Sequence, residues 1–128
     1  MKTEEAKLTR RNGTPLDTVT LDEFETDTQA WERVSLENNG MLGDVILANT
    51  FEIPKVDILA LAAEILMHGD NAVSARAYVG VKDYPENPGT REMRLYFTGV
   101  NRSNLPILEW PDGASAIYDF TMPCPPTC

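Results

Sequence analysis

The hydrophobic pattern predicts a first helix near the N-terminus. Thr20 and Glu23 form a capping-box sequence, in which each side chain can bind the backbone amide of the other residue. Apolar residues follow at helical intervals: Leu21, Phe24, Trp31 and Val34. Because Asn38-Asn39-Gly40 is a typical helix stop, we expect a helix over about residues 21–36.

Residues 41–68 predict a strand followed by a second helix. The apolar positions within residues 41–53 favour a strand, with a break near Asn49-Thr50. Pro54 suits the start of a helix and Gly69 suits its end, which predicts a helix over about residues 54–68. Apolar residues lie on nearly every side of this helix, so we expect it to be the most buried helix and the centre of the core. Its expected contacts are Ile58, Leu59, Ala62, Ile65 and Leu66.

A period of two predicts a hairpin over residues 72–82 and 92–100. Turn-forming residues fill positions 83–89, so the two strands are expected to pair antiparallel. Residue numbers that sum to about 174 then lie opposite each other, and Tyr78 faces Tyr96. One face of the hairpin is apolar and is expected to be buried. It carries Val73, Ala75, Ala77, Val79, Val81, Met93, Leu95, Phe97 and Gly99.

The remaining segments complete a single domain of the α+β class. Residues 105–110 are a candidate strand with Pro106 on an edge, and residues 116–120 are apolar enough to dock. We expect a flexible N-terminal arm over residues 1–19 and a Pro- and Cys-containing tail over residues 121–128. Residues 1–128 are therefore predicted to form one domain in which helices pack on a mainly antiparallel sheet.

Charge narrows the classes of partner. Of 128 residues, 11 are Lys or Arg and 20 are Asp or Glu, which gives a net charge of −9. This balance argues against nucleic acid and anionic membranes as partners. No window reaches the ~18 apolar residues of a membrane span, and the first residues lack a secretory signal. We therefore expect an acidic, cytoplasmic protein and, with His68 as the single histidine, no metal or other cofactor.

Two Arg-x-Tyr motifs lie on the strands of the expected hairpin. Arg76, Tyr78, Arg94 and Tyr96 share one face, which we name the Arg/Tyr face. Cross-strand pairing on a half-exposed sheet explains this pattern without any function. Tyr and Arg are also frequent at binding hot spots. We therefore interpret the face as a binding surface for another protein chain, with the acidic residues 17–32 of a second copy as one candidate counterpart.

The tail contains a cysteine pair. Pro125-Pro126 favours a polyproline II path of about 3.1 Å per residue, which places the Cα atoms of Cys124 and Cys128 roughly 12 Å apart. A disulfide needs a separation of at most about 7 Å, so we expect free thiols and no intramolecular bridge. A bridge, a zinc site and thiol redox chemistry are the alternatives.

Three segments of the second half together resemble a family of small bacterial proteins without an assigned activity. The family has a Gly-x-Arg-x-Tyr-x-Gly strand, a Leu-Val-Gly-Val-Asp-like strand and a Pro-Cys-Pro-Pro-x-Cys tail. Here these segments are residues 74–80, 95–101 and 123–128, with Ser74 in place of the usual Gly and Asn101 in place of the usual Asp. The resemblance covers residues 50–128. It implies the order of the helix and strands along the chain, but it implies no catalytic or binding activity.

These observations favour a non-enzymatic binding or protein-interaction module that uses the Arg/Tyr face, with formation of a homo-oligomer included. One alternative is a small enzyme or small-ligand binder with Tyr78, Arg94 and His68 in its site. His68 is also explained as a complement to the dipole at a helix C-terminus. The other alternative is a thiol or metal role for Cys124 and Cys128.

Overall fold

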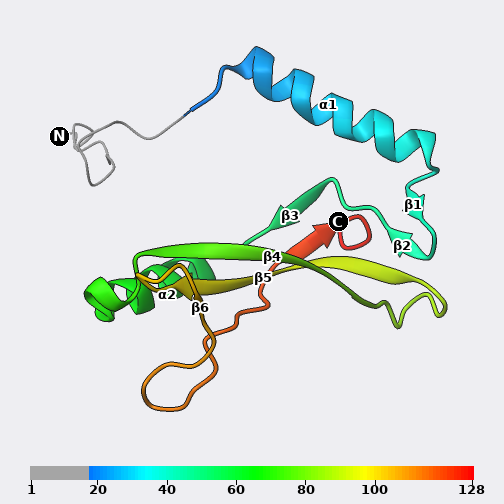
Figure 1. Cartoon of the computed structure of the whole chain (residues 1–128). Helices are drawn as coiled ribbons and strands as arrows, with labels where there is room; N and C mark the ends of the chain where they lie inside the picture. The colour runs from blue at the N-terminus through cyan, green and yellow to red at the C-terminus, as the bar shows by residue number, and fades with distance from the viewer. Residues whose placement is uncertain (1–17) are drawn as a thin grey trace.

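The computed structural model describes residues 18–128. Residues 1–17 of the arm expected at residues 1–19 therefore lie outside the described part. The protein has an α+β fold with a mainly antiparallel sheet (Figure 1). The elements are α1 (Leu21–Glu37), β1 (Met41–Leu42), β2 (Val45–Ile46), β3 (Thr50–Glu52), α2 (Lys55–Met67), the 3₁₀ turn η1 (Gly69–Asn71), β4 (Ser74–Asp83), β5 (Arg91–Val100), β6 (Pro106–Ile107) and β7 (Met122–Cys124).

The β4–β5 hairpin is the main element of the sheet, and its register is as predicted. Tyr78 lies opposite Tyr96, and the pairing runs along the full length of both strands. The other edge of β5 is paired in three places: parallel with β2 at Arg91, by an isolated bridge between Phe97 and Tyr118, and antiparallel with β6 at Gly99. Strand β5 therefore lies inside the sheet, whereas β4 lies at its end.

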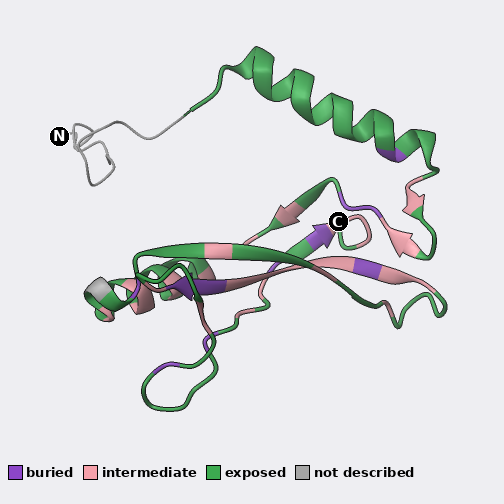
Figure 2. Ribbon diagram, in the orientation of Figure 1, coloured by how far each residue is buried: buried purple, intermediate pink, exposed green. Residues whose placement is uncertain are grey.

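Helix α1 begins at the predicted capping box. The backbone N–H of Glu23 donates to the Thr20 hydroxyl, and the Thr20 N–H donates to the Glu23 carboxylate. The helix extends away from the sheet (Figure 1) and is exposed along nearly its whole length (Figure 2). The Trp31 indole N–H donates to the carbonyl of Ala48 at 2.8 Å, and this bond ties the helix to the segment after β2.

The predicted position of the second helix is confirmed, but its predicted burial is wrong. Helix α2 contains no buried residue, and Leu66 is 79% exposed. A narrow stripe of half-buried residues faces the rest of the protein: Asp57, Leu61, Glu64, Ile65 and the following His68. The expectation failed because the helix lies at one end of the hairpin (Figure 1), where only one of its sides has a neighbour.

The buried residues form two clusters instead, one where β5 ends and β4 begins and one in the segment after β2. Ala72, Val100, Trp110 and Ala116 are the buried apolar residues of the first cluster. Leu47 and Ala48 are those of the second, where the Ala48 N–H contacts Met93 Sδ near the start of β5. Figure 2 shows buried backbone at the end of β5, in the segment between β2 and β3, and at β7. Gly99 allows the close packing of the first cluster, because a Cβ atom at this position would lie 3.2 Å from Ile107 Cδ1 and 3.5 Å from Trp110 Cη2.

The expected apolar face of the hairpin is not buried on β4. Val79 is 69% exposed, and Val73 and Val81 are also exposed. On β5 the buried residues include Glu92 and Thr98, which alternation places on the Arg/Tyr face. The prediction was wrong because Asp119, from the segment beside β5, reaches Arg94 on the Arg/Tyr face. On the opposite face the contacts lie over β5, where Ile107 and Trp110 pack at Gly99 and Phe120 stacks on Phe97.

The tail turns back on itself, which contradicts the expectation of separated thiols. Cys124 and Cys128 form a disulfide with a Cα–Cα distance of 4.8 Å. The Thr127 N–H donates to the Pro123 carbonyl, and the peptide bonds before Pro125 and Pro126 are cis. The polyproline II argument assumed an extended trans path, and the chain does not follow that path. Residue Cys124 also pairs with Thr50, so the tail is part of the β3–β7 sheet.

Candidate functional site

The hairpin brings the four residues of the Arg/Tyr face together. The register places Tyr78 opposite Tyr96, and Arg94 opposite Gly80. The absence of a side chain at Gly80 leaves room for the Tyr96 ring, whose Cε2 atom would lie 2.7 Å from a Cβ atom at that position. The face is therefore a packed arrangement of rings and guanidinium groups across two strands.

Arg94 is engaged within the protein. Its Nη2 and Nε atoms lie 2.6 and 3.0 Å from Asp119 Oδ1, and its Nη1 atom lies 3.4 Å from Glu92 Oε2. The Arg94 side chain is only 16% exposed. Lys82 also contacts Asp119, at 3.5 Å. Two carboxylates thus balance the charge of Arg94, which reduces what this residue can offer to an incoming anion.

Asp119 is a residue of this face that was not predicted from the sequence. Its signal was the alternation of Tyr118, Asp119 and Phe120, which is typical of a segment that runs beside a strand. Tyr118 bridges to Phe97, and Phe120 stacks on Phe97 with ring centroids 5.2 Å apart. Asp119 therefore points to the opposite side, toward Arg94.

Arg76 and Tyr78 form the more exposed half of the face. Arg76 Nη2 donates to Asn104 Oδ1 at 2.6 Å, and its Nη1 lies 3.4 Å from the Tyr78 hydroxyl. Tyr78 is 39% exposed. Both residues come from β4, the end strand of the sheet, so a partner can reach them from the side as well as from above.

Shifted pKa values occur at the far end of the hairpin, near its turn. The Arg91 guanidinium donates to both Asp44 oxygens, and these hydrogen bonds hold the pKa of Asp44 below its usual value. A hydrogen bond to Glu86 raises the pKa of Tyr84. The Arg91–Asp44 pair joins β5 to the turn between β1 and β2, which explains it as a structural contact.

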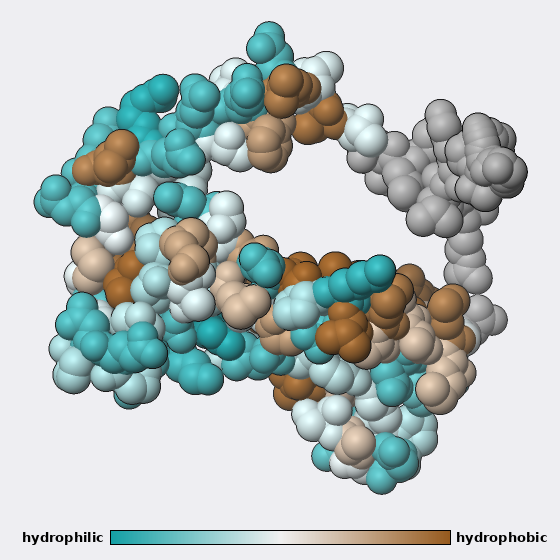
Figure 3. Space-filling model, turned by 180° about the vertical axis from the view of Figure 1, so that it is seen from behind, coloured by the Kyte–Doolittle hydropathy of each residue, from teal (hydrophilic) through white to brown (hydrophobic). Residues whose placement is uncertain are grey.

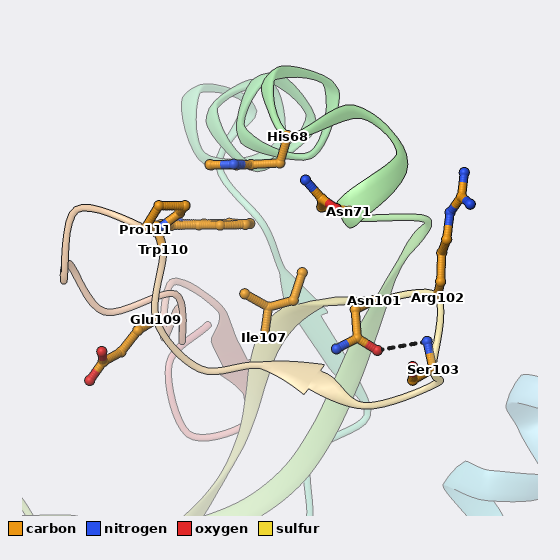
Figure 4. A pocket seen from close by; sticks show the side chains of 9 residues that line it. All are labelled: His68, Asn71, Asn101, Arg102, Ser103, Ile107, Glu109, Trp110 and Pro111. Atoms are coloured by element: carbon orange, nitrogen blue, oxygen red, sulfur yellow. Dashed lines mark hydrogen bonds between the residues drawn. The ribbon is translucent and has the colours of Figure 1, made fainter.

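His68 lies in a pocket of about 670 Å³ (Figure 4). Its ring stacks on Trp110, with centroids 4.1 Å apart and planes within 3°. The Trp110 N–H donates to the Tyr118 hydroxyl at 2.7 Å, which fixes the indole. The remaining lining residues are Asn71, Asn101, Arg102, Ser103, Ile107, Glu109 and Pro111.

The structure does not bring His68 together with Tyr78 and Arg94. Trp110 and Ile107 lie over Gly99, whose position in β5 faces away from the Arg/Tyr face. His68 stacks on the far side of Trp110 in this same region. The three residues therefore do not form one site. The pocket offers an aromatic wall together with amide and hydroxyl groups, which suits hydrogen bonding to a small polar molecule.

The outward side of α2 is the second surface of interest. Its helical period groups six apolar residues on one face, which we name the α2 outer face: Val56, Leu59, Ala60, Ala63, Leu66 and Met67. All six are exposed. Figure 3, seen from behind, shows hydrophobic side chains at the surface in this region of the molecule. Apolar stripes at this spacing ordinarily pack on another element.

The tail cysteines offer no thiolate while they are bridged. Within residues 18–128, no group of three or more His, Cys, Asp and Glu residues is arranged to hold a metal ion. The same part of the chain has no helix with both the length and the apolar character needed to cross a bilayer. Comparisons with protein-family models, with curated proteins and with solved structures find no match to this chain.

Proposed function

We propose that the protein is a non-enzymatic protein-interaction module whose main contact surface is the α2 outer face. The observation that supports this proposal most directly is the exposure of large apolar side chains on a helix that is apolar nearly all round. Such helices are normally buried. Contiguous exposed apolar surface is typical of interaction sites in soluble proteins.

The free energy gained by burying the α2 outer face is large enough to support binding of a partner. Full burial of a Val, Leu or Met side chain contributes about 1.5–3 kcal/mol. The four large residues of the α2 outer face would together contribute about 6–12 kcal/mol, which is comparable to the estimated ~4–15 kcal/mol cost of association. Polar contacts from a second surface would then favour the complex. The half-buried Arg76 and the exposed Tyr78 can supply such contacts, so the Arg/Tyr face is retained in the proposal through these two residues.

A pair of matched double variants tests this proposal. Leu59→Glu with Leu66→Glu places two charges on the α2 outer face, while Leu21→Glu with Leu36→Glu places the same charges on similarly exposed leucines of α1. We expect both variants to keep the mass of the parent chain in light scattering, the α1 variant to keep its co-purified partners, and the α2 variant to lose those partners. Circular dichroism should show both variants folded. Unchanged co-purification of partners with the α2 variant would contradict the proposal.

The expected cytoplasmic location belongs to this proposal as well, and the disulfide weighs against it. Disulfides persist mainly in oxidising compartments. Rapid alkylation of the protein in intact cells, followed by mass analysis, tests the location: two alkylated cysteines support the cytoplasm, and an intact Cys124–Cys128 bridge contradicts it. The family resemblance of residues 50–128 adds no activity to the proposal.

Binding of a small polar ligand is a second candidate function, favoured by the pocket beside His68. Its volume of about 670 Å³ lies in the range of ligand sites. Trp110 is a built-in reporter, because Trp31→Phe leaves it as the only tryptophan of the two in the chain. A ligand that enters should change the fluorescence of this variant in a saturable way. The same response after Asn71→Ala and Asn101→Ala would show that the ligand binds elsewhere.

A further inference from the structure

The outer edge of β4 has no strand beside it within residues 18–128. The direction of its backbone groups follows from β5. Phe97 exchanges both backbone hydrogen bonds with Tyr118, so its N–H and C=O point away from β4. Since hydrogen-bonded and non-bonded pairs alternate in an antiparallel ladder, the even-numbered residues of β4 bond to β5. The free edge therefore presents the N–H and C=O groups of Ala75, Ala77, Val79 and Val81.

This edge lacks the usual protection against pairing. Exposed edge strands are commonly short, or interrupted by proline, bulges or inward charges. Strand β4 is ten residues long, contains no proline and pairs with β5 without a bulge. The residues that present the free backbone groups are Ala and Val, and all four are exposed. Another extended strand would satisfy these groups and cover these side chains together.

We propose that a second copy of this chain pairs with β4, strand to strand and antiparallel, about a two-fold axis at Tyr78. The inference rests on the proposed function in the class of partner, a protein chain, and adds a second contact surface, β4, for a second copy. Antiparallel pairing of a strand with itself is what a two-fold axis produces. The two sheets would then form one continuous sheet through the β4 strands.

The register follows from the side chains. Because the odd-numbered residues of both copies carry the free backbone groups, each odd-numbered residue must lie opposite another odd-numbered residue, so the two residue numbers of every opposed pair add up to an even sum. A two-fold axis near the centre of β4 gives a sum of 156 or 158. A sum of 158 would place Arg76 opposite Lys82 of the second copy, and like charges directly opposite each other are destabilising. A sum of 156 places Arg76 opposite Gly80, Lys82 opposite Ser74 and Tyr78 opposite Tyr78. In this register Ala75 also lies opposite Val81, and Ala77 lies opposite Val79, so all four residues of the free edge are paired.

Charge opposes approach less at this strand than over most of the surface. The chain carries a net charge of −9, so most of its surface repels a second copy. Strand β4 carries Arg76 and Lys82 against a single acid, Asp83 at its end. The strand is therefore one of the few segments through which two such acidic chains can meet without strong repulsion.

Cysteine cross-linking tests both the pairing and its register. In a non-hydrogen-bonded antiparallel pair the Cα atoms lie about 4.5 Å apart, within the range of a disulfide. We expect oxidised Tyr78→Cys to run as a covalent dimer. Val79→Cys is the matched control: its two copies are diagonal neighbours about 7–8 Å apart and should cross-link poorly. A dimer from Val79→Cys and none from Tyr78→Cys would overturn the register, and no dimer from either would overturn the pairing.

An edge proline separates this inference from the proposed function. The N–H of Ala77 points to the free edge, so Ala77→Pro removes no bond to β5. We expect the parent chain to have twice the chain mass in light scattering and Ala77→Pro to have the monomer mass. Hydrogen exchange on the parent should show concentration-dependent protection of Ala75, Ala77, Val79 and Val81 amides.

A parent chain that stays monomeric, or protection that does not depend on concentration, would overturn the self-pairing. The second outcome would point to the chain's own residues 1–17 on the edge. In either case, if Leu59→Glu with Leu66→Glu still abolishes partner binding, the proposed function stands and only the self-pairing falls.

Discussion

The ring of Tyr96 lies directly over Gly80 on the neighbouring strand, where a Cβ atom would be 2.7 Å from its Cε2 atom. Gly80→Ala should therefore push the ring aside and cost about 1–3 kcal/mol of stability, as overpacking usually does. Tyr96→Ala should remove the conflict, so that adding Gly80→Ala to it is neutral or slightly stabilising. A double-mutant cycle by urea unfolding measures this coupling. Additive effects of the two substitutions would show that the ring does not depend on the glycine.

Leu66 and Val100 test where the core lies. Leu66 is 79% exposed in the chain, whereas Val100 is 3% exposed. Leu66→Ala should change the free energy of unfolding by less than about 0.5 kcal/mol. Val100→Ala should cost about 2 kcal/mol through lost burial and a residual cavity. Denaturant titration at low protein concentration, where association is minimal, gives both values. A cost of several kcal/mol for Leu66→Ala would restore α2 to the core.

The tail should contain no reactive thiol before reduction. Labelling of the unreduced protein should modify neither Cys124 nor Cys128, and reduction should release two thiols in a chain of unchanged oligomeric state. Replacement of both cysteines by serine should cost about 2 kcal/mol, the loop-closure entropy expected for a ring of about five residues. Two thiols that label without reductant would show that the bridge is absent in solution.

Asp119 should matter more than its exposure suggests. Asp119→Asn removes the charge that faces Arg94, whose side chain is 16% exposed and bound to both Asp119 and Glu92. We expect a loss of about 1–3 kcal/mol, in the range for hydrogen bonds to charged groups. Lys82→Met is the control, because Lys82 is half-exposed and its contact with Asp119 should contribute less than about 1 kcal/mol. Equal effects of the two substitutions would contradict this assignment.

The Asp44–Arg91 pair should make stability depend on acid pH. Its hydrogen bonds hold the pKa of Asp44 below the usual value in the folded state. The contribution of Asp44 is therefore fully present above its unfolded pKa of about 3.9 and is lost as pH falls through the lower folded value. Asp44→Asn should lower stability at pH 6 and reduce the slope of stability against pH below about pH 4. Parallel curves for parent and variant across that range would contradict the prediction.

The sequence by itself determined the parts of the fold that depend on neighbours in the chain. The capping box of α1 joins residues three apart, and it forms as predicted. The hairpin register depends on one short loop and on the period of two, and Tyr78 lies opposite Tyr96 as predicted. The bounds of α2 follow from a proline and a glycine at its ends. Each of these features is local, so residue spacing carries the information.

Only the tertiary structure decided which faces are covered. The side of the hairpin that receives Asp119 depends on a segment 25 residues beyond Arg94, and no periodicity within the hairpin reveals that segment. The apolar pattern of α2 predicts that the helix needs a neighbour, yet the described chain supplies one on a single side. The disulfide likewise depends on a turn in the tail, where the two prolines predicted an extended path. Burial depends on contacts between segments that are distant in the chain. A hydrophobic pattern predicts that a face will be covered, but it does not identify the segment that covers it.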